Sequence, residues 1–244
     1  MKATRAIAVT IIATLCALTT EGDEPARRYD AGRGVSVMVP SYVILPTDSP
    51  TESADRREPD GRQLELVVTF VSYRDAVRRP RATSEALRSQ LASAEDQPLS
   101  VVAQAMDRSD EPLLIEWDDT YQASESYQRI QVDGGIEAEA WFTASAEAGL
   151  APEAFGVIVG VPVSDGILGI LLEYFDPEYT YFESLPDLFE TTEAGHRWRA
   201  TAGPNDLYRA IFLSEESGLL GGLQARMREA VAMLLDSIAL EDSK

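Results

Sequence analysis

The alternation of apolar and polar residues predicts a sheet in the middle of the chain. Residues 64–73 (LELVVTFVSY) are mostly aliphatic or aromatic, which is typical of a strand covered in part on both faces. Residues 127–132 alternate between polar and apolar positions, and residues 136–143 continue in the same way. The Asp-Gly-Gly sequence at 133–135 supplies the positive φ angles that a hairpin turn needs. We therefore expect two antiparallel strands here.

A second hairpin follows the same plan. Apolar segments at 154–163 and 167–175 flank a Ser-Asp-Gly turn at 164–166. With the preceding hairpin, these segments predict an antiparallel meander of four strands.

Three segments change to helical periodicity. Residues 83–94 place leucines four positions apart after a serine or threonine cap, which predicts an amphipathic helix. Residues 204–216 predict a second helix, with a proline near its start. Residues 219–240 give the clearest helix, because apolar residues recur at spacings of three and four. This stripe consists of Leu219, Leu223, Met227, Ala230, Val231, Leu234, Leu235 and Ile238.

Shorter segments complete the expected fold. Residues 35–39 and 42–45 predict short strands that each end before a proline, and residues 100–106 and 112–118 are also strand-like. Residues 46–62 are rich in Pro, Ser, Asp and Arg without apolar periodicity, so we expect a flexible surface loop.

Together these patterns predict the α+β class. We expect a mainly antiparallel sheet, a helix after its first strands, and a C-terminal amphipathic helix packed on it. The hydrophobic fraction of 45% favours a packed core, and residues 23–244 suit a single domain.

The first 22 residues have the pattern of an export signal. Lys2 and Arg5 precede an uncharged, mostly apolar run at 6–19, and acidic residues end it. This run is shorter than the roughly 20 apolar residues that a membrane-spanning helix needs. We therefore expect export without a transmembrane span.

Cys16 is the chain's one cysteine, and two interpretations of it remain open. Lipoprotein signals place a small residue before the modified cysteine, whereas here that residue is Leu15. Cleavage after Thr19 or Gly22 would satisfy the preference for small residues and would remove Cys16. We favour the cleaved form, which is periplasmic or secreted; in the alternative, Cys16 carries a lipid anchor in the envelope.

Composition excludes several classes of function. The net charge of −20 opposes binding to nucleic acid phosphates and to anionic membranes. A mature chain without cysteine has no disulfide, thiol nucleophile or thiolate metal ligand. We expect no metal and no cofactor. The basic residues are nearly all arginine, which is typical of a GC-rich bacterial genome.

Candidate catalytic residues are few. His196 is the single histidine, and no Gly-x-Ser-x-Gly sequence accompanies it, so a serine triad and a zinc enzyme are both disfavoured. Asp118 with Asp119, and Glu137 with Glu139, are the densest carboxylates, and two carboxylates are enough for glycoside hydrolysis. With so many acidic residues, however, such pairs are expected by chance.

Three loops have residues that could bind an ion, but each lacks part of the required motif. The turns at Asp133 and Asp165 lack the repeated aspartates of a calcium loop, and turn formation explains both residues. Residues 218–222 are glycine-rich but lack the lysine of a phosphate-binding loop.

Aromatic residues gather between positions 174 and 212, with arginines among them. Both residue types are enriched in binding interfaces, although a side layer of the core would have the same composition. If this segment is a binding surface, its candidate residues are Arg197, Trp198, Arg199 and Tyr208.

The order of elements resembles the Mog1/PsbP-like domains. The matching features are the strand at 34–40 that ends in proline and the closing helix with Leu234-Leu235-Asp236-Ser237-Ile238. Tyr42 stands where the family often has tryptophan, and residues 175–216 resemble an insertion. The family has no shared active site, so the resemblance implies interaction more than catalysis.

The sequence thus predicts an exported bacterial envelope protein with a non-catalytic binding domain. Its partner would be another envelope protein or a small ligand. The alternative is an exported hydrolase that uses carboxylates.

Overall fold

A computed structural model describes most of the chain between residues 26 and 240. The described ranges are 26–59, 61–72, 120–132, 136–145, 150–193, 195–214 and 222–240. The predicted export signal, the helix at 83–94 and the strands at 100–106 and 112–118 lie outside them. Within the described ranges, no helix combines the length and the apolar character needed to cross a bilayer.

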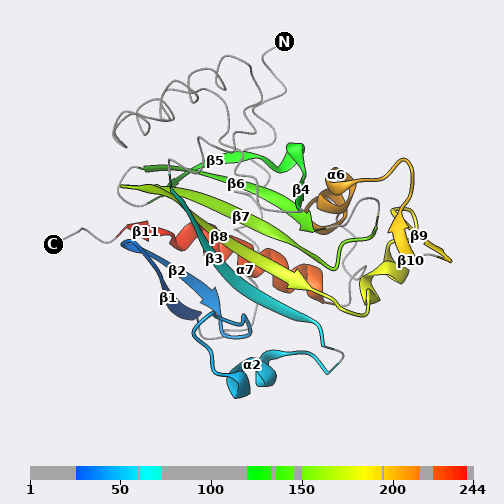
Figure 1. The fold of residues 1–244 in the computed structure, drawn as a ribbon, viewed down its shortest axis with the longest axis horizontal. Coiled ribbons are helices and arrows are strands. Elements are labelled where there is room, and N and C mark those ends of the chain that lie inside the picture. Colours follow the sequence, from blue (N-terminus) through cyan, green and yellow to red (C-terminus); the bar gives the residue numbers. More distant parts are fainter. Residues whose placement is uncertain are drawn as a thin grey trace, which may run out of the picture.

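The central element is a six-stranded antiparallel sheet in the order β3-β8-β7-β6-β4, with β5 also paired to β6 (Figure 1). Its strands are β3 (Gln63–Ser72), β4 (Thr120–Gln122), β5 (Gln128–Val132), β6 (Ile136–Ser145), β7 (Ala154–Val163) and β8 (Gly166–Phe175). The pairing predicted for the two hairpins is confirmed, since β5 pairs with β6 and β7 pairs with β8, both antiparallel.

A smaller sheet joins the two ends of the described chain. It has the order β1-β2-β11 and consists of β1 (Ala26–Gly32), β2 (Val35–Pro40) and β11 (Ala239–Leu240). Helix α7 (Leu223–Ser237) packs against β2 and crosses behind the larger sheet, where it contacts β8 and β5 (Figure 1). The predicted α+β class, with a C-terminal helix on a mainly antiparallel sheet, is confirmed.

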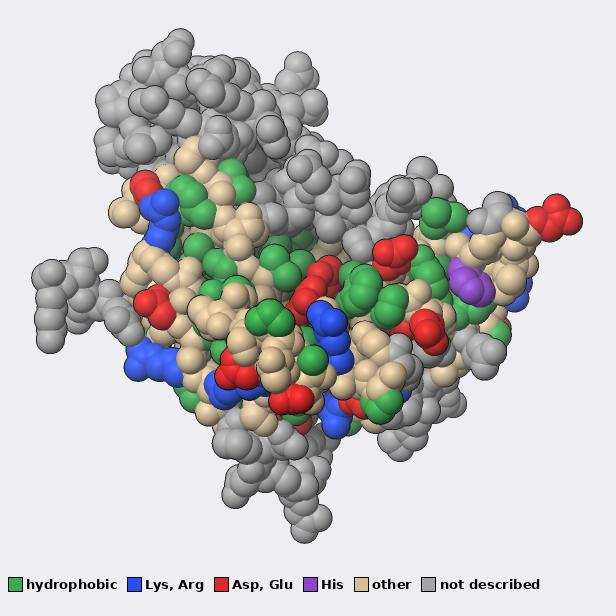
Figure 2. All heavy atoms as spheres, turned by 60° about the horizontal axis from the view of Figure 1, so that its bottom comes forward, with side chains coloured by type: hydrophobic (Ala, Val, Ile, Leu, Met, Phe, Trp, Pro, Cys, Tyr) green, Lys and Arg blue, Asp and Glu red, His purple; other side chains and the backbone are tan. Residues whose placement is uncertain are grey.

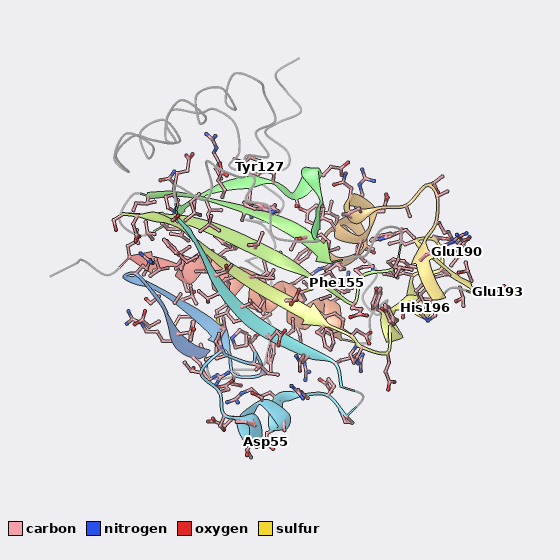
Figure 3. All side chains as sticks on the ribbon, in the orientation of Figure 1. Asp55, Tyr127, Phe155, Glu190, Glu193 and His196 are labelled. Carbon is pink, nitrogen blue, oxygen red and sulfur yellow. The ribbon has the colours of Figure 1, made fainter. Side chains whose placement is uncertain are left out.

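The core lies between the large sheet and α7. Strand alternation turns Leu64 and Leu66 inward on β3, and both are buried. Phe155 on β7 is fully buried near the middle of the molecule (Figure 3). Its ring centroid lies 5.0 Å from that of Tyr174 and 5.3 Å from that of Tyr181. These aromatic contacts tie the sheet to the segment that follows it.

The aromatic segment after β8 belongs largely to this core. It forms η3 (Thr180–Ser184), β9 (Phe189–Thr192), β10 (Gly195–Trp198), α6 (Pro204–Tyr208) and a single π-helical stretch, η4 (Arg209–Leu213). Tyr181, Phe189, Tyr208 and Phe212 are all buried. Most of the aromatic side chains between positions 174 and 212 therefore pack into the core.

The expected loop at 46–62 contains a helix, α2 (Pro50–Arg56), which is a correction to the sequence analysis. The helix forms because Ser49 caps it. The Glu52 amide donates to the Ser49 hydroxyl at 3.3 Å, and the Ser49 amide donates to the Glu52 carboxylate at 2.9 Å. This reciprocal capping satisfies two helix-end donors without any buried residue on α2.

The predicted strand at 42–45 is also different in the structure. Ile44 forms an isolated parallel bridge with Glu65, with hydrogen bonds of 2.8 Å to Leu64 and from Leu66. The surrounding residues form turns. This bridge places the chain leading to α2 along the edge of β3 that lies opposite β8.

We expect Ser49→Ala to lower the free energy of unfolding by about 1 kcal/mol, because the cap of α2 is lost. Urea denaturation measures this change. Thr51→Ala, at an exposed position on the same helix, is the matched control and should leave stability unchanged within about 0.5 kcal/mol. Equal losses in the two variants would contradict the role given to Ser49.

Candidate functional site

An arginine-lined pocket of about 300 Å³ opens between α2, the start of β3 and the start of α7. Its lining residues are Tyr42, Arg56, Glu58, Arg62, Gln63, Leu64, Tyr174, Gly222 and Arg226. Three arginines against one glutamate make the pocket locally positive in a chain of net charge −20. Seen from the side of α2, basic and acidic side chains are interleaved over this part of the surface (Figure 2).

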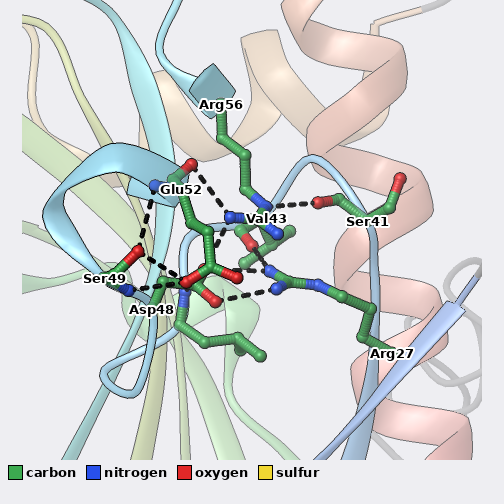
Figure 4. A network of polar contacts seen from close by, with 8 residues as sticks. Arg27, Ser41, Val43, Asp48, Ser49, Glu52 and Arg56 are labelled. Carbon is green, nitrogen blue, oxygen red and sulfur yellow. Dashed lines mark hydrogen bonds and ion pairs between the residues drawn. The ribbon is translucent and has the colours of Figure 1, made fainter. Parts of the chain in front are cut away.

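Arg56 is held in place by a buried carboxylate (Figure 4). Asp48, with a side chain only 6% exposed, lies 3.2 Å from Arg56 and 2.9 Å from Arg27. Asp48 also accepts the Leu45 amide at 2.8 Å. Burial raises the pKa of Asp48, but the hydrogen bonds from Arg27 and Leu45 outweigh it, so the net pKa lies below its usual value. Asp48 therefore stays ionised at neutral pH and orients Arg56.

Arg226 stands at the mouth of the pocket, on the first turn of α7. It pairs with Glu58, and its guanidinium lies 5.3 Å from the centre of the Tyr42 ring. The Arg226 and Glu58 side chains are 51% and 37% exposed. Ion pairs this exposed contribute little to stability because water screens them. A competing anion can therefore exchange with Glu58 at small cost.

The N-terminus of α7 adds to the positive field. Gly222 is the N-cap, with a φ of +89° that favours glycine, and no side chain caps this helix end. The first amides of a helix carry a partial positive charge along its axis. Because Gly222 lines the pocket, this helix end reinforces the arginines.

Two glutamates are paired on the opposite face of the sheet from the pocket. Glu65 on β3 is the direct cross-strand partner of Glu173 on β8, and both are half-buried. The Gln63 side-chain amide donates to Glu65 at 2.8 Å. Burial raises the pKa of Glu173 to about 7, with the Glu65 charge adding to this effect. Burial also raises the pKa of Glu65, against the opposing charge of Arg57.

Sequence reasoning missed this pair, although a signal was present. Glu65 interrupts an apolar strand between Leu64 and Leu66, and Glu173 does the same between Leu172 and Tyr174. A charged residue inside an apolar strand is unusual, and it occurs in both strands. That the two glutamates are partners can be predicted only when the register of the strands is known.

The carboxylates that the sequence favoured have structural partners. Glu137 pairs with Arg129 at 3.3 Å, and Glu139 accepts the Tyr127 hydroxyl at 2.7 Å. Burial is the main cause that raises the pKa of Tyr127 to about 12. Asp165 pairs with Arg33 on the turn between β1 and β2. Asp118, Asp119 and Asp133 lie outside the described residues.

The four predicted binding residues lie away from the pocket. The Trp198 ring lies tilted against that of Phe189, with their centroids 4.6 Å apart, and Arg197 is 2.7 Å from Glu190. Arg199 donates to a backbone carbonyl, that of Pro186, at 2.7 Å. Tyr208 is buried. The proposed binding role of these four residues stays a prediction.

His196 lies on β10, near Glu190 and Glu193 at one end of the molecule (Figure 3). Its ring centroid is 4.2 Å from that of Phe182, and Nδ1 is 3.3 Å from the Thr191 hydroxyl. Within the described part of the chain, no three His, Cys, Asp or Glu side chains are grouped to hold a metal.

Comparison with known proteins gives one structural likeness. No protein-family model matches the chain, and no curated protein matches it. The solution structure of cyanobacterial PsbP from Synechocystis sp. PCC 6803 aligns with 75% of this chain and 99% of its own, at 12% identity and a TM-score of 0.27. This is a weak resemblance to the PsbP-like fold.

Proposed function

We propose that this chain is an exported, non-catalytic binding domain whose ligand is a small molecule with two or more negative charges. The single observation that carries the proposal is the meeting of Arg56, Arg62 and Arg226 at one pocket, at the N-terminus of α7, in a strongly acidic chain. Carriage of an anion fits the predicted envelope location, whether the leader is cleaved or Cys16 is lipidated.

Arginine side chains suit this ligand for a chemical reason. The planar guanidinium presents paired donors that match the oxygens of a carboxylate, phosphate or sulfate. The pocket volume of about 300 Å³ lies at the lower end of the range for small-molecule sites. Arg226 has an exposed, exchangeable partner in Glu58, so an entering anion takes the place of the Glu58 carboxylate.

The alternative of a carboxylate-based hydrolase would rest on Glu65 and Glu173. Two carboxylates with separated affinities for protons are the usual acid–base pair of such enzymes. Strand alternation, however, turns both away from the sheet face on which Leu64 and Tyr174 line the pocket. A ligand in the pocket would lie across the sheet from these acids, so binding is favoured over hydrolysis.

Isothermal titration calorimetry with sulfate tests the proposal. We expect sulfate to bind at neutral pH and Arg62→Met to weaken this binding about tenfold, because a charge-assisted contact is lost while the side-chain stem is kept. Arg62 is chosen because Arg56→Met would also break the contact with Asp48.

Arg199→Met is the matched control, since it removes the same charge at an exposed position. Arg199 is also one of the binding residues predicted from the sequence. It should leave sulfate affinity unchanged. If Arg199→Met abolishes binding and Arg62→Met does not, the site lies at the β9–β10 end and the pocket assignment is wrong. If the wild type does not bind sulfate, the proposed function fails.

A further inference from the structure

The glutamate pair and the pocket share one end of the β3–β8 ladder. Leu64 and Tyr174, which line the pocket, are cross-strand partners, and Glu65 and Glu173 form the next rung. One step along a strand moves the Cα atom by about 3.8 Å. Strand alternation turns the pair to the opposite face of the sheet from the pocket, so the two sites are separated by the thickness of one sheet, a low-dielectric layer through which charges interact more strongly than in water.

Two further residues connect the sites. Gln63 lines the pocket, and its side-chain amide donates to Glu65 at 2.8 Å. Arg57 acts electrostatically on Glu65 and directly follows the pocket residue Arg56. A change of charge at the pair therefore changes how far Glu65 offsets the positive charge of Arg57, and it changes the acceptor of the Gln63 amide.

We propose that Glu65 and Glu173 share one proton, and that uptake of this proton and binding of an anion in the pocket favour each other. The proposal rests on the function assigned to the pocket above and adds its regulation by pH. No remote switch is needed, because the two sites occupy adjacent rungs of one ladder.

The sign of the coupling follows from the charges. With both glutamates ionised, two negative charges on the opposite face of the sheet repel an anion that enters the pocket. A shared proton removes one of these negative charges. The positive charge of Arg57 is then offset less by the pair and attracts the ligand more strongly. Coupling between two binding sites is reciprocal, so the bound anion also makes the pair hold its proton more tightly. The pKa of Glu173, raised to about 7, places this exchange near neutral pH.

The charged groups that face the pair and the pocket are few among the described residues. Arg57 acts on Glu65, and Glu65 acts on Glu173. The pocket itself carries Arg56, Arg62, Arg226 and Glu58. His196, the chain's one histidine, lies on β10 and is not among the lining residues.

Sulfate is the probe for this coupling, because its own charge does not change between pH 6 and pH 8. We expect the wild type to bind sulfate about fivefold more tightly at pH 6 than at pH 8. Glu173→Gln should bind equally at both pH values, with the affinity that the wild type has at pH 6. Calorimetry at pH 7 in two buffers with different heats of ionisation should detect proton uptake in the wild type and none in Glu173→Gln.

Glu193→Gln is the matched control. It makes the same change in net charge at an exposed position, at the far end of the molecule from α2 (Figure 3). It should keep the pH dependence of the wild type, and circular dichroism at both pH values checks that each variant is folded.

The outcomes separate the two proposals. If Arg62→Met loses sulfate binding but the wild type binds sulfate equally at both pH values, the coupling is refuted and the pocket assignment stands. A Glu173→Gln variant with the wild-type pH dependence would refute it as well. Absence of sulfate binding at both pH values would refute the pocket function and the coupling together.

Discussion

Asp48→Ala is expected to lower the free energy of unfolding by about 3 kcal/mol at pH 7, because it leaves two partly buried arginines without their shared counter-ion, whose own side chain is buried. The Asp48 side chain is 6% exposed, and those of Arg27 and Arg56 are 23% and 20% exposed. The loss is therefore much larger than for a surface ion pair. Urea denaturation followed by circular dichroism measures it. Because Arg56 lines the pocket, sulfate affinity should fall as well.

The pH dependence of this effect has a definite sign. The pKa of Asp48 is lowered in the folded state, so its contribution to stability is present above the unfolded value of 3.8 and is lost as the pH falls through the folded value. The difference between wild type and Asp48→Ala should therefore shrink below about pH 4.

Asp55→Ala is the control for Asp48→Ala, since Asp55 is an exposed aspartate on the neighbouring helix α2 (Figure 3). It should change stability by less than about 0.5 kcal/mol. Similar losses for both variants would mean that the arginines find other partners and that Asp48 does not organise them.

Glu173→Gln is expected to raise the free energy of unfolding at pH 8 by up to about 3 kcal/mol. The pKa of Glu173 rises from 4.5 to about 7 on folding, because burial and the Glu65 charge disfavour its ionised form. The folded state thus holds the proton more tightly than the unfolded state. Stability contributed by this proton is complete below pH 4.5 and is lost as the pH rises through about 7.

The substitution should therefore stabilise the protein at pH 8 and have little effect at pH 4.5. Thermal or urea unfolding across this range measures the difference. Glu193→Gln, at an exposed position, should be close to neutral throughout. If Glu173→Gln destabilises the protein at pH 8, the pair does not repel in the folded state, and its assigned proton exchange is wrong.

Local pattern was enough to predict the sheet and its last helix. The hairpins at β5–β6 and β7–β8 combine alternating apolar residues with Gly-containing turns, and α7 carries an apolar stripe at helical spacing. Each of these signals lies within about 25 residues of sequence. The order of strands could not be predicted in the same way, because β3 pairs with β8 about a hundred residues later.

Helix α2 was missed because it buries no side chain and so has no apolar periodicity. Its signal lay in the cap, where Ser49 and Glu52 have the spacing of a capping box. A search for caps, in addition to apolar stripes, would have found it in residues expected to form a loop.

The pocket was beyond local reasoning. Arg56 and Arg62 belong to one stretch of sequence, but Arg226 comes from α7, and only the fold brings them together. The composition of the segment 174–212, rich in aromatic residues and arginine, suggested a binding surface. Its aromatic side chains, however, mostly fill the core. Composition could not distinguish a buried layer from a binding surface.

The small sheet has a consequence for how the chain matures. Ser237 on α7 accepts the Met38 amide at 2.7 Å across 199 residues, and β11 adds to β2 beside it. Ribosomes add about 5–20 residues per second, so β2 waits on the order of ten seconds or longer for its last partners. During that delay β2 lacks its contacts with α7 and β11. In a chain with this topology, the hydrogen bonds that β2 makes to α7 and β11 are therefore among the last to form.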